Sequence, residues 1–222
     1  MPERAAGARC QGVTRVYRSA SGPVLALHEV DAAVAPGQVT AVVGPSGSGK
    51  STLLRIMAAL DRPTEGDVQV AGHDLNALSR RARRTLRRRH IGFMLPRPAD
   101  NLLPYLTAAE HVQLAADLRG APMDDGLLPS LGLDHRLHHR PLELSGGEQQ
   151  RLALAAAVVG DPGLVLADEP TAELDQASAA RLIDALRTIA GRGSALAVAT
   201  HDPLVVEAAD HVIRIIDGEV VL

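Results

Sequence analysis

Hydrophobic residues in this chain form short unbroken runs, separated by longer segments that read as helices. The runs at 39–43, 164–167 and 195–200 are almost wholly apolar, which is typical of strands buried on both faces of a parallel sheet. Helices are expected over about 51–60 and 175–190, directly after two of these runs. Strands that alternate with helices predict an α/β fold with a mainly parallel sheet.

The two ends of the chain depart from that alternation. β-type runs at 11–17 and 24–30, joined by a turn at 19–23, predict a first strand pair. A further strand is expected at 66–70. Near the C-terminus, Asp217-Gly218 between the runs 211–216 and 219–222 is a hairpin signal. The N-terminal part is therefore expected to be an antiparallel β unit.

The middle of the chain is expected to be helical. After a strand at 91–95, Pro96, Pro98 and Pro104 should break any regular element. Capping-box patterns, which begin at Thr107 and at Ser145, predict helices to about 118 and 159, and a short helix is expected at 127–131. Segment 97–160 thus reads as a helical insertion into one domain that spans 1–222.

Composition excludes several classes of function. Apolar residues make up 46% and charged residues 22% of the chain, with a formal charge of −3, so a globular protein without an overall basic field is expected. Three aromatic residues, Tyr17, Phe93 and Tyr105, give few platforms for stacking bases. Cys10 alone excludes an intrachain disulfide. Because residues 1–4 begin no hydrophobic signal core and no run of 18 apolar residues exists, a cytoplasmic chain is expected.

A phosphate-binding loop is the strongest chemical signal. The motif G-x-x-x-x-G-K-S stands between a predicted strand and a predicted helix, the context that this motif requires. Its backbone N–H groups and the start of the helix would wrap phosphate oxygens. Lys50 would reach the β- and γ-phosphates of a nucleoside triphosphate, and the Ser51 hydroxyl would bind Mg²⁺. The loop comprises Gly44, Pro45, Ser46, Gly47, Ser48, Gly49, Lys50 and Ser51, with Thr52 beside it.

Two adjacent acids end a second buried strand. Asp168 and Glu169 follow the apolar run at 164–167, and the carboxyl ends of parallel strands are where ligands bind in such sheets. Asp168 is placed to hold Mg²⁺, directly or through water. Glu169 is placed to orient or deprotonate the water that attacks the nucleotide.

The string Leu-Ser-Gly-Gly-Glu-Gln-Gln-Arg at 144–151 resembles the signature of ATP-binding cassette (ABC) ATPases. With the phosphate loop and the two acids, the resemblance covers nearly the whole chain. It implies a P-loop NTPase (RecA-like) core with a helical subdomain at about 97–160. It also implies a head-to-tail dimer, in which Ser145, Gly146 and Gly147 cover the γ-phosphate held by the other subunit.

The resemblance assigns three further residues. Tyr17 resembles the aromatic residue that stacks on adenine, with a core tyrosine as the alternative. Asp175 resembles the residue that crosses the dimer interface, and His201 resembles the switch histidine at the γ-phosphate. The other eight histidines are expected to be structural; His135, His138 and His139 lie close together but lack the acids or cysteines of a metal site.

Residues 101–110 and the compact length resemble cassettes of the macrolide-exporter and lipoprotein-release branch. The resemblance implies a membrane permease partner with few helices and a large external domain, and a second cassette, expected to be the same chain. It places the protein at the inner face of the cell membrane through that permease. Some machines of this branch move lipids or peptides and others transmit force, and the sequence does not separate the two.

One position departs from the family pattern. Pro96 stands where the family has a glutamine that contacts Mg²⁺ and the attacking water, and proline offers no side-chain hydrogen bond. Either turnover is lowered, or Asp100 or Asn101 replaces the contact. A nucleotide-gated module with weak hydrolysis therefore stays as an alternative function, and so does a soluble ABC ATPase that acts on nucleic acid.

Seven arginines lie within residues 80–90. They are compatible with a solvated helix face, with membrane proximity or, least of all, with nucleic acid. These residues are Arg80, Arg81, Arg83, Arg84, Arg87, Arg88 and Arg89.

Overall fold

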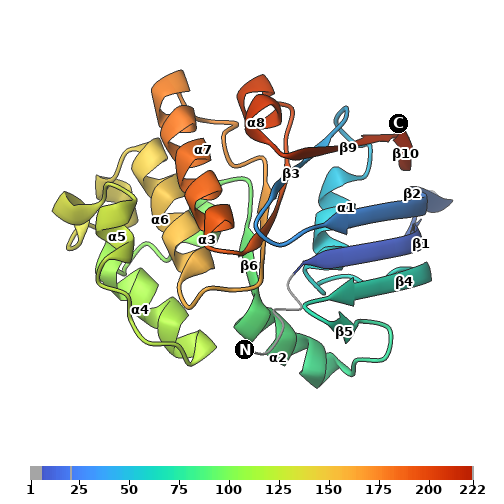
Figure 1. Cartoon of the computed structure of the whole chain (residues 1–222), viewed down its shortest axis with the longest axis horizontal. Helices are drawn as coiled ribbons and strands as arrows, with labels where there is room; N and C mark the ends of the chain where they lie inside the picture. The colour runs from blue at the N-terminus through green and yellow to red at the C-terminus, as the bar shows by residue number, and fades with distance from the viewer. Residues whose placement is uncertain (1–6, 21, 222) are drawn as a thin grey trace.

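The computed structural model describes residues 7–20 and 22–221, which form two sheets and a helical lobe (Figure 1). The strands are β1 (Ala8–Ser19), β2 (Gly22–Val34), β3 (Val39–Val43), β4 (Glu65–Val70), β5 (His73–Asp74), β6 (Ile91–Met94), β7 (Leu164–Asp168), β8 (Ala195–Ala199), β9 (His211–Ile216) and β10 (Glu219–Val221). The helices are α1 (Lys50–Met57), α2 (Arg80–His90), α3 (Pro98–Asn101), α4 (Ala108–Arg119), α5 (Leu127–Ser130), α6 (Gly146–Val158), α7 (Gln176–Gly191) and α8 (Pro203–Ala208), with 3₁₀ turns η1 (Asp134–Arg136) and η2 (Pro141–Glu143).

The larger sheet has the strand order β10-β9-β3-β8-β7-β6 and is parallel except for β10. Every residue of β3, β7 and β8 is buried. Side chains of β7 alternate between the two cores: Leu164 and Leu166 pack with α1, whereas Val165 and Ala167 pack with α6 and α7. Both faces of the sheet are therefore covered, as the unbroken apolar runs predict.

The smaller sheet has the order β2-β1-β4-β5 and is antiparallel. It shares a core with α1, in which Val13, Leu27 and Val68 pack against Leu53 and Met57. In Figure 1 this sheet and α1 stand on one side of β3, and helices α4 to α7 stand on the other. The first helix after β3 is thereby held between two sheets.

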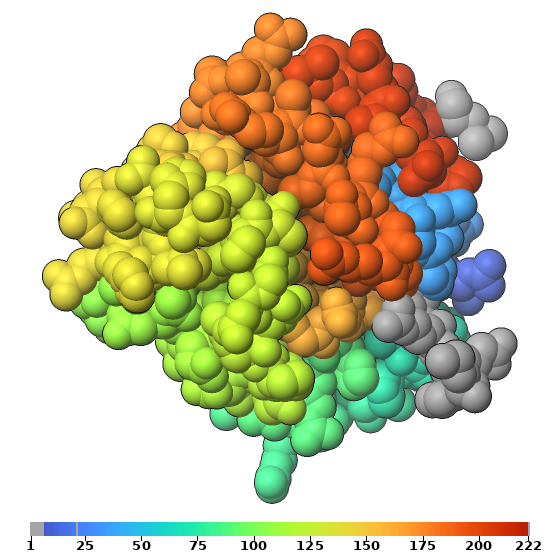
Figure 2. Space-filling model, turned by 60° about the vertical axis from the view of Figure 1, so that its left-hand side comes forward, coloured from blue at the N-terminus to red at the C-terminus, as the bar shows by residue number. Residues whose placement is uncertain are grey.

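The helical lobe lies between β6 and β7 in sequence and contains no strand in residues 97–160. Figure 2 shows this segment, in green to yellow, as a separate bulge beside the orange and red C-terminal part. Helix α6 joins the lobe to the core, because it contacts α4, α7 and β6.

The fold agrees with the expected architecture, with a few corrections. Helix α1 ends at Met57 rather than near residue 60, because Ala59 has a positive φ of 55° and the N–H groups of Leu60 and Asp61 donate to Arg55. Pro98 does not break structure; it begins α3, where proline is tolerated because the first N–H is unpaired. Helix α8 and strand β5 were not expected. The predicted signal-free start at 1–4 and Leu222 lie outside the described residues.

Candidate functional site

The phosphate loop begins where β3 ends, and its lysine forms hydrogen bonds with the first residues of the loop. The Lys50 ammonium donates hydrogen bonds to the carbonyls of Gly44 (2.8 Å) and Pro45 (3.0 Å), and it is nearly buried, with 7% of the residue exposed. Gly49 precedes α1 with a φ of 108° and offers no side-chain cap. The first N–H groups of α1 therefore face a loop that is open to an anion.

Two glycines of the loop are required by packing. At Gly44, φ is 152° and an added Cβ would overlap the carbonyl oxygen of Ile215 in β9. At Gly49 it would overlap the carbonyl oxygen of Ala26 in β2. The loop is thus wedged between the two sheets, and only glycine allows that approach. At Gly47 an added Cβ would meet open space.

Ser51 and Asp168 meet at the carboxyl edge of the sheet. The Ser51 hydroxyl donates to Asp168 Oδ1 at 3.1 Å, which joins the first turn of α1 to the end of β7. Burial raises the pKa of Asp168, and the nearby Glu169 carboxylate adds to that rise, against the lowering effect of the Ser51 hydrogen bond. Lys50 and Arg55 lower the pKa as well, so it is burial, rather than a lack of nearby cations, that chiefly disfavours the charged carboxylate.

Glu169 and His201 lie at the same edge and contact each other. His201 Nδ1 is 2.9 Å from Glu169 Oε2, and the histidine side chain is 72% exposed whereas that of Glu169 is 21% exposed. Glu169 has a positive φ of 47°, and its N–H donates to the carbonyl of Ala199 in β8 at 2.8 Å. The neighbouring strand thus holds a conformation that is costly for a non-glycine residue.

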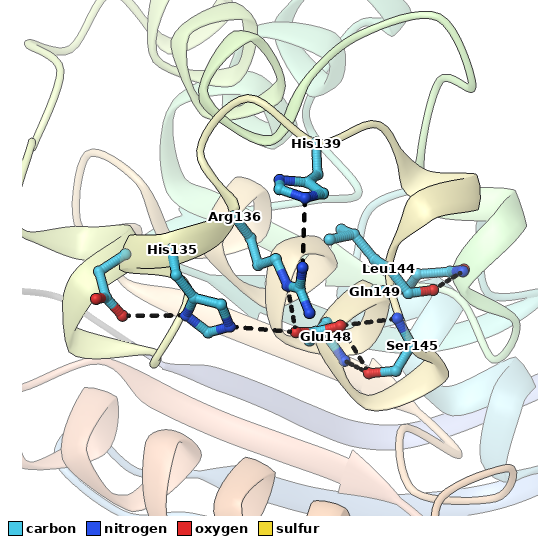
Figure 3. A network of polar contacts seen from close by, with 8 residues as sticks. His135, Arg136, His139, Leu144, Ser145, Glu148 and Gln149 are labelled. Carbon is cyan, nitrogen blue, oxygen red and sulfur yellow. Dashed lines mark hydrogen bonds and ion pairs between the residues drawn. The ribbon is translucent and has the colours of Figure 1, made fainter.

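The signature segment forms the N-terminus of α6 with a complete capping box. Ser145 Oγ accepts from the Glu148 N–H at 3.3 Å, and Glu148 Oε2 accepts from the Ser145 N–H and hydroxyl at 2.8 and 2.9 Å (Figure 3). An added Cβ at Gly147 would lie 2.8 Å from the Ser178 hydroxyl of α7. Ser178 in turn bonds to Asp175, the N-cap of α7. Gly147 thus lets the starts of α6 and α7 lie side by side.

A polar network holds Glu148 from the other side. Arg136 Nε donates to Glu148 Oε1 at 2.8 Å, His135 Nε2 lies 3.6 Å from the same oxygen, and His139 contacts Arg136 (Figure 3). Burial alone would raise the pKa of Glu148, but the hydrogen bonds from Arg136 and Ser145 outweigh burial and lower that pKa to about 2. No sequence pattern predicts this network, because only the turn η1 brings Arg136 back to α6.

Tyr17 lies on β1, near the end of that strand that leads to β2. Its hydroxyl donates to Asp61 Oδ2 at 2.8 Å, and the Arg15 guanidinium lies 4.3 Å from its ring centroid. Asp61 also accepts from Arg55 at 3.0 Å. Burial would raise the pKa of Asp61, yet the hydrogen bonds from Arg55 and Tyr17 lower it. The ring is therefore held in place by polar contacts, which differs from a tyrosine that is simply packed in a core.

Pro96 is tied to the signature helix. Gln150 of α6 is almost fully buried, and its Nε2 donates to the Pro96 carbonyl at 3.2 Å. Asn101 bonds to both the N–H (2.8 Å) and the carbonyl (2.9 Å) of Leu95, and Asp100 pairs with Arg97 at 3.0 Å. Both residues that were considered as substitutes for the glutamine thus already have partners.

The residues present fit a nucleotide with Mg²⁺. Magnesium takes oxygen ligands from one or two side chains together with phosphate oxygens, and Ser51 and Asp168 supply such a pair of oxygens. Lys50 provides the positive charge for phosphate, and Gly47 leaves space beside it. One edge of the sheet brings together five of the predicted site residues: Lys50, Ser51, Asp168, Glu169 and His201. Ser145 and Asp175 instead lie at the starts of α6 and α7. This arrangement defines a P-loop nucleotide-binding protein.

Comparison with known proteins gives the family. The family described as "ABC transporter" matches residues 27–172. The macrolide export ATP-binding/permease protein MacB of Rhodopseudomonas palustris is 40% identical over 217 residues, covering 95% of this chain and 33% of that protein. The lipoprotein-releasing system ATP-binding protein LolD of Chromohalobacter salexigens is 39% identical over 217 residues, covering 95% and 91%.

Solved structures agree with that result. The dimeric structure of MJ0796, a bacterial ABC transporter cassette, matches with a TM-score of 0.85 at 34% identity and covers 96% of both chains. Its post-hydrolysis dimer bound to ADP and Pi matches with a TM-score of 0.84. The chain belongs to the ABC transporter family and is an ATPase cassette of the MacB and LolD type. It spans about a third of the length of the macrolide export relatives.

The relatives bear on the alternatives. Their names describe transporter components, and they lend no support to a nucleic-acid ATPase or to a nucleotide-gated module with weak hydrolysis. Within residues 7–20 and 22–221, none of the helices combines the length and the apolar character that a bilayer span requires.

Proposed function

We propose that this cassette binds Mg-ATP on the 44–51 loop and hydrolyses it in a head-to-tail dimer. The observation that carries the proposal is the presence of two helix N-termini with the features of phosphate sites, those of α1 and α6, in a chain with one phosphate loop. The dimeric state of MJ0796 supports the same arrangement. Ser145 and Gly147 of one subunit would then face the γ-phosphate on Lys50 of the other, with Asp175 at the interface.

The proposed chemistry uses residues that the fold brings together. Lys50 holds the phosphates, and Ser51 and Asp168 would hold Mg²⁺, which neutralises charge on phosphate oxygens when it is bound. Glu169 orients the attacking water and accepts its proton. His201, 2.9 Å from Glu169, keeps that carboxylate in position and lies exposed toward the γ-phosphate. Tyr17 would stack on adenine with the ring face opposite Arg15.

The proposed partner is a membrane permease with few helices and a large external domain. The support comes from the relatives, since MacB is named as a macrolide export ATP-binding/permease protein and LolD as the ATP-binding protein of a lipoprotein-releasing system. The cassette would then lie at the cytoplasmic face of the membrane. A second copy of this chain is the proposed second cassette.

The test is a variant that binds ATP but does not cleave it. Glu169→Gln removes the proposed base and keeps the shape of the side chain, so Mg-ATP should accumulate and hold the dimer closed. Light scattering should report a dimer with Mg-ATP and a monomer without it. Glu207→Gln, an exposed acid on α8, is the matched control. If Glu169→Gln stays monomeric with Mg-ATP, both alone and with its permease, the head-to-tail proposal is wrong.

A further inference from the structure

A cavity of about 410 Å³ lies between α2 and the segment that follows α1, away from the nucleotide site. It opens at the C-terminal end of α1, whereas the phosphate loop precedes the N-terminal end of that helix. In Figure 1, α2 lies at the lower edge of the molecule, beneath β4 and β5. The cavity is lined by Ala59, Leu60, Arg62, Arg80, Arg83, Arg84 and Arg87.

Five of the seven described residues that line the cavity are arginines, and none of the seven is acidic. Among the residues that the structure describes, none of the five arginines lies within ion-pair distance of a carboxylate. Clustered cations without anions repel each other, and a ligand with negative charge relieves that repulsion. The chain as a whole is acidic, with a formal charge of −3, so the cluster does not follow from composition.

Three of the arginines have structural partners, and Arg62 donates to the carbonyl of Leu78 at 3.3 Å. Arg83 donates to the carbonyls of Leu75 and Asp61, and Arg87 donates to the carbonyl of Ala59 at 2.8 Å. Arg83 is 4% exposed, its Nε has no partner among the described residues, and burial together with Arg62 and Arg87 lowers its pKa. The guanidinium groups of Arg83 and Arg87 thus form a fixed and positively charged floor.

Arg80 and Arg84 have no such structural role. Both are exposed, and neither makes a side-chain hydrogen bond or ion pair with a described residue. Arg80 also lies in the first turn of α2, which has no acidic residue, and a cation there opposes the helix dipole. An anion in the cavity would interact favourably with the helix N-terminus and with both side chains.

We propose that the cavity formed by α2 and residues 59–62 binds a phosphate-bearing anion. Guanidinium groups pair with phosphate oxygens through two parallel hydrogen bonds, and four such groups on one helix match a headgroup or a small polyphosphate. The shared chemistry is a phosphate mono- or diester, carried either by a soluble anion or by an acidic phospholipid. The second source would anchor α2 at the membrane surface.

Inorganic pyrophosphate is the probe for the soluble source. The full chain is titrated by calorimetry in a Lys50→Ala background, so that any residual binding at the 44–51 loop is the same in every variant. Arg80→Gln/Arg84→Gln should weaken the cavity's affinity at least tenfold. The control, Arg81→Gln/Arg88→Gln, removes the same charge from the same helix at positions that do not line the cavity. It should change the affinity for pyrophosphate less than about threefold, the effect typical of exposed charges.

Vesicles of phosphatidylcholine with phosphatidylglycerol probe the lipid source. Co-sedimentation that is lost in Arg80→Gln/Arg84→Gln and kept in the control assigns the site to a lipid headgroup. Loss of pyrophosphate binding alone assigns it to a soluble anion. If both double variants lose binding equally, whether to pyrophosphate, to vesicles or to a DNA duplex, the effect is one of general charge and the proposal is wrong. The proposal is also wrong if the parent binds neither pyrophosphate nor vesicles. Thermal melting checks folding, and Arg84→Gln alone replaces the double variant if that variant unfolds.

Discussion

The N-termini of α1 and α6 differ in what occupies them. At α1 the cap is Gly49, which has no side chain, and no acid lies in the first turn. At α6 the cap is Ser145, and Glu148 fills the box with a carboxylate. The N-terminus of α1 therefore leaves its N–H groups open for phosphate, whereas at α6 the capping box already satisfies two N–H groups, those of Ser145 and Glu148, from its own chain.

The difference suggests an order of events. The α1 site has a buried lysine, and it can bind phosphate without a partner. The α6 site offers an incoming phosphate a helix end that already carries a negative side chain, so it contributes only when another subunit presents the phosphate at short range. Nucleotide binding before dimerisation follows from that difference.

The largest expected effect is at α1. Lys50→Ala removes the buried charge of the phosphate loop and should weaken ATP binding at least tenfold, since hydrogen bonds to charged groups are worth about 1.5–3 kcal/mol. Lys50 is the one lysine in the sequence, so its acylation, located by peptide mapping, reports on this loop directly. In the parent, ATP should protect Lys50. Unchanged ATP affinity in Lys50→Ala would contradict the proposed site.

The second prediction concerns Pro96, which follows β6 and accepts a hydrogen bond from Gln150 of α6. Pro96→Gln should raise turnover about tenfold, the scale of one recovered positioning contact, with little change in apparent ATP affinity, because binding rests on the loop at α1. Pro104→Gln is the control, since Pro104 is exposed. A Pro96→Gln rate at or below that of the parent contradicts this account.

The rival account of Pro96 can be tested by itself. If Asp100 has replaced the glutamine, it must leave Arg97, and Asp100→Ala should lower the rate. Asn101→Ala is less informative, because Asn101 holds both the N–H and the carbonyl of Leu95 and its loss would loosen the loop. Turnover of Asp100→Ala equal to that of the parent would exclude this rival.

Local signals were sufficient for most of the fold. The strand–loop–helix around Gly44 and the two capping boxes depend on neighbours within a few residues, so sequence analysis placed them well. Helix α1 ended early because Ala59 adopts a left-handed conformation without a glycine to signal it. The sequence does not predict α3, because a proline usually breaks regular structure, whereas Pro98 stands at the first helical position, where proline is tolerated.

Long-range contacts could not be predicted in the same way. Gln150 and Pro96 are 54 residues apart, and Tyr17 and Asp61 are 44 residues apart. Neither pair has a sequence pattern that announces it, because both depend on how separate elements pack. Motifs predict the residues of the proposed nucleotide site, whereas only the structure identifies the groups that hold Glu148 and Tyr17 in place.

The third prediction tests the filled end of α6. Glu148→Gln keeps the capping geometry and loses the charge that Arg136 meets, so the free energy of unfolding should fall by about 1–2 kcal/mol. Because the pKa of Glu148 is lowered to about 2 from 4.5, this loss should be full above pH 4.5 and shrink as pH falls toward 2. Urea titrations across that range measure it.

The control for this third prediction is Glu110→Gln in the matching box of α4, where Thr107 is the N-cap and no described arginine lies within ion-pair distance of the carboxylate. It should lose less stability than Glu148→Gln. The same substitution at Glu148 should also strengthen the Mg-ATP-dependent dimer, because a negative charge beside the partner's phosphate has gone. Equal unfolding free energies for the two variants would mean that Arg136 adds nothing at α6.

The smallest expected effect has the opposite sign and lies at the open site. Burial raises the pKa of Asp168, so its ionised carboxylate destabilises the nucleotide-free protein. The ionised carboxylate of Glu148, whose pKa is lowered, stabilises it. Asp168→Asn should therefore raise the melting temperature of the nucleotide-free protein while it abolishes any dependence of ATP binding on Mg²⁺. Because protonation removes the cost, the gain should be full above the raised pKa and vanish below pH 3.8. A melting temperature that falls in Asp168→Asn at neutral pH would show that the Ser51 contact outweighs burial. Asp168 would then stabilise the fold, as Glu148 does.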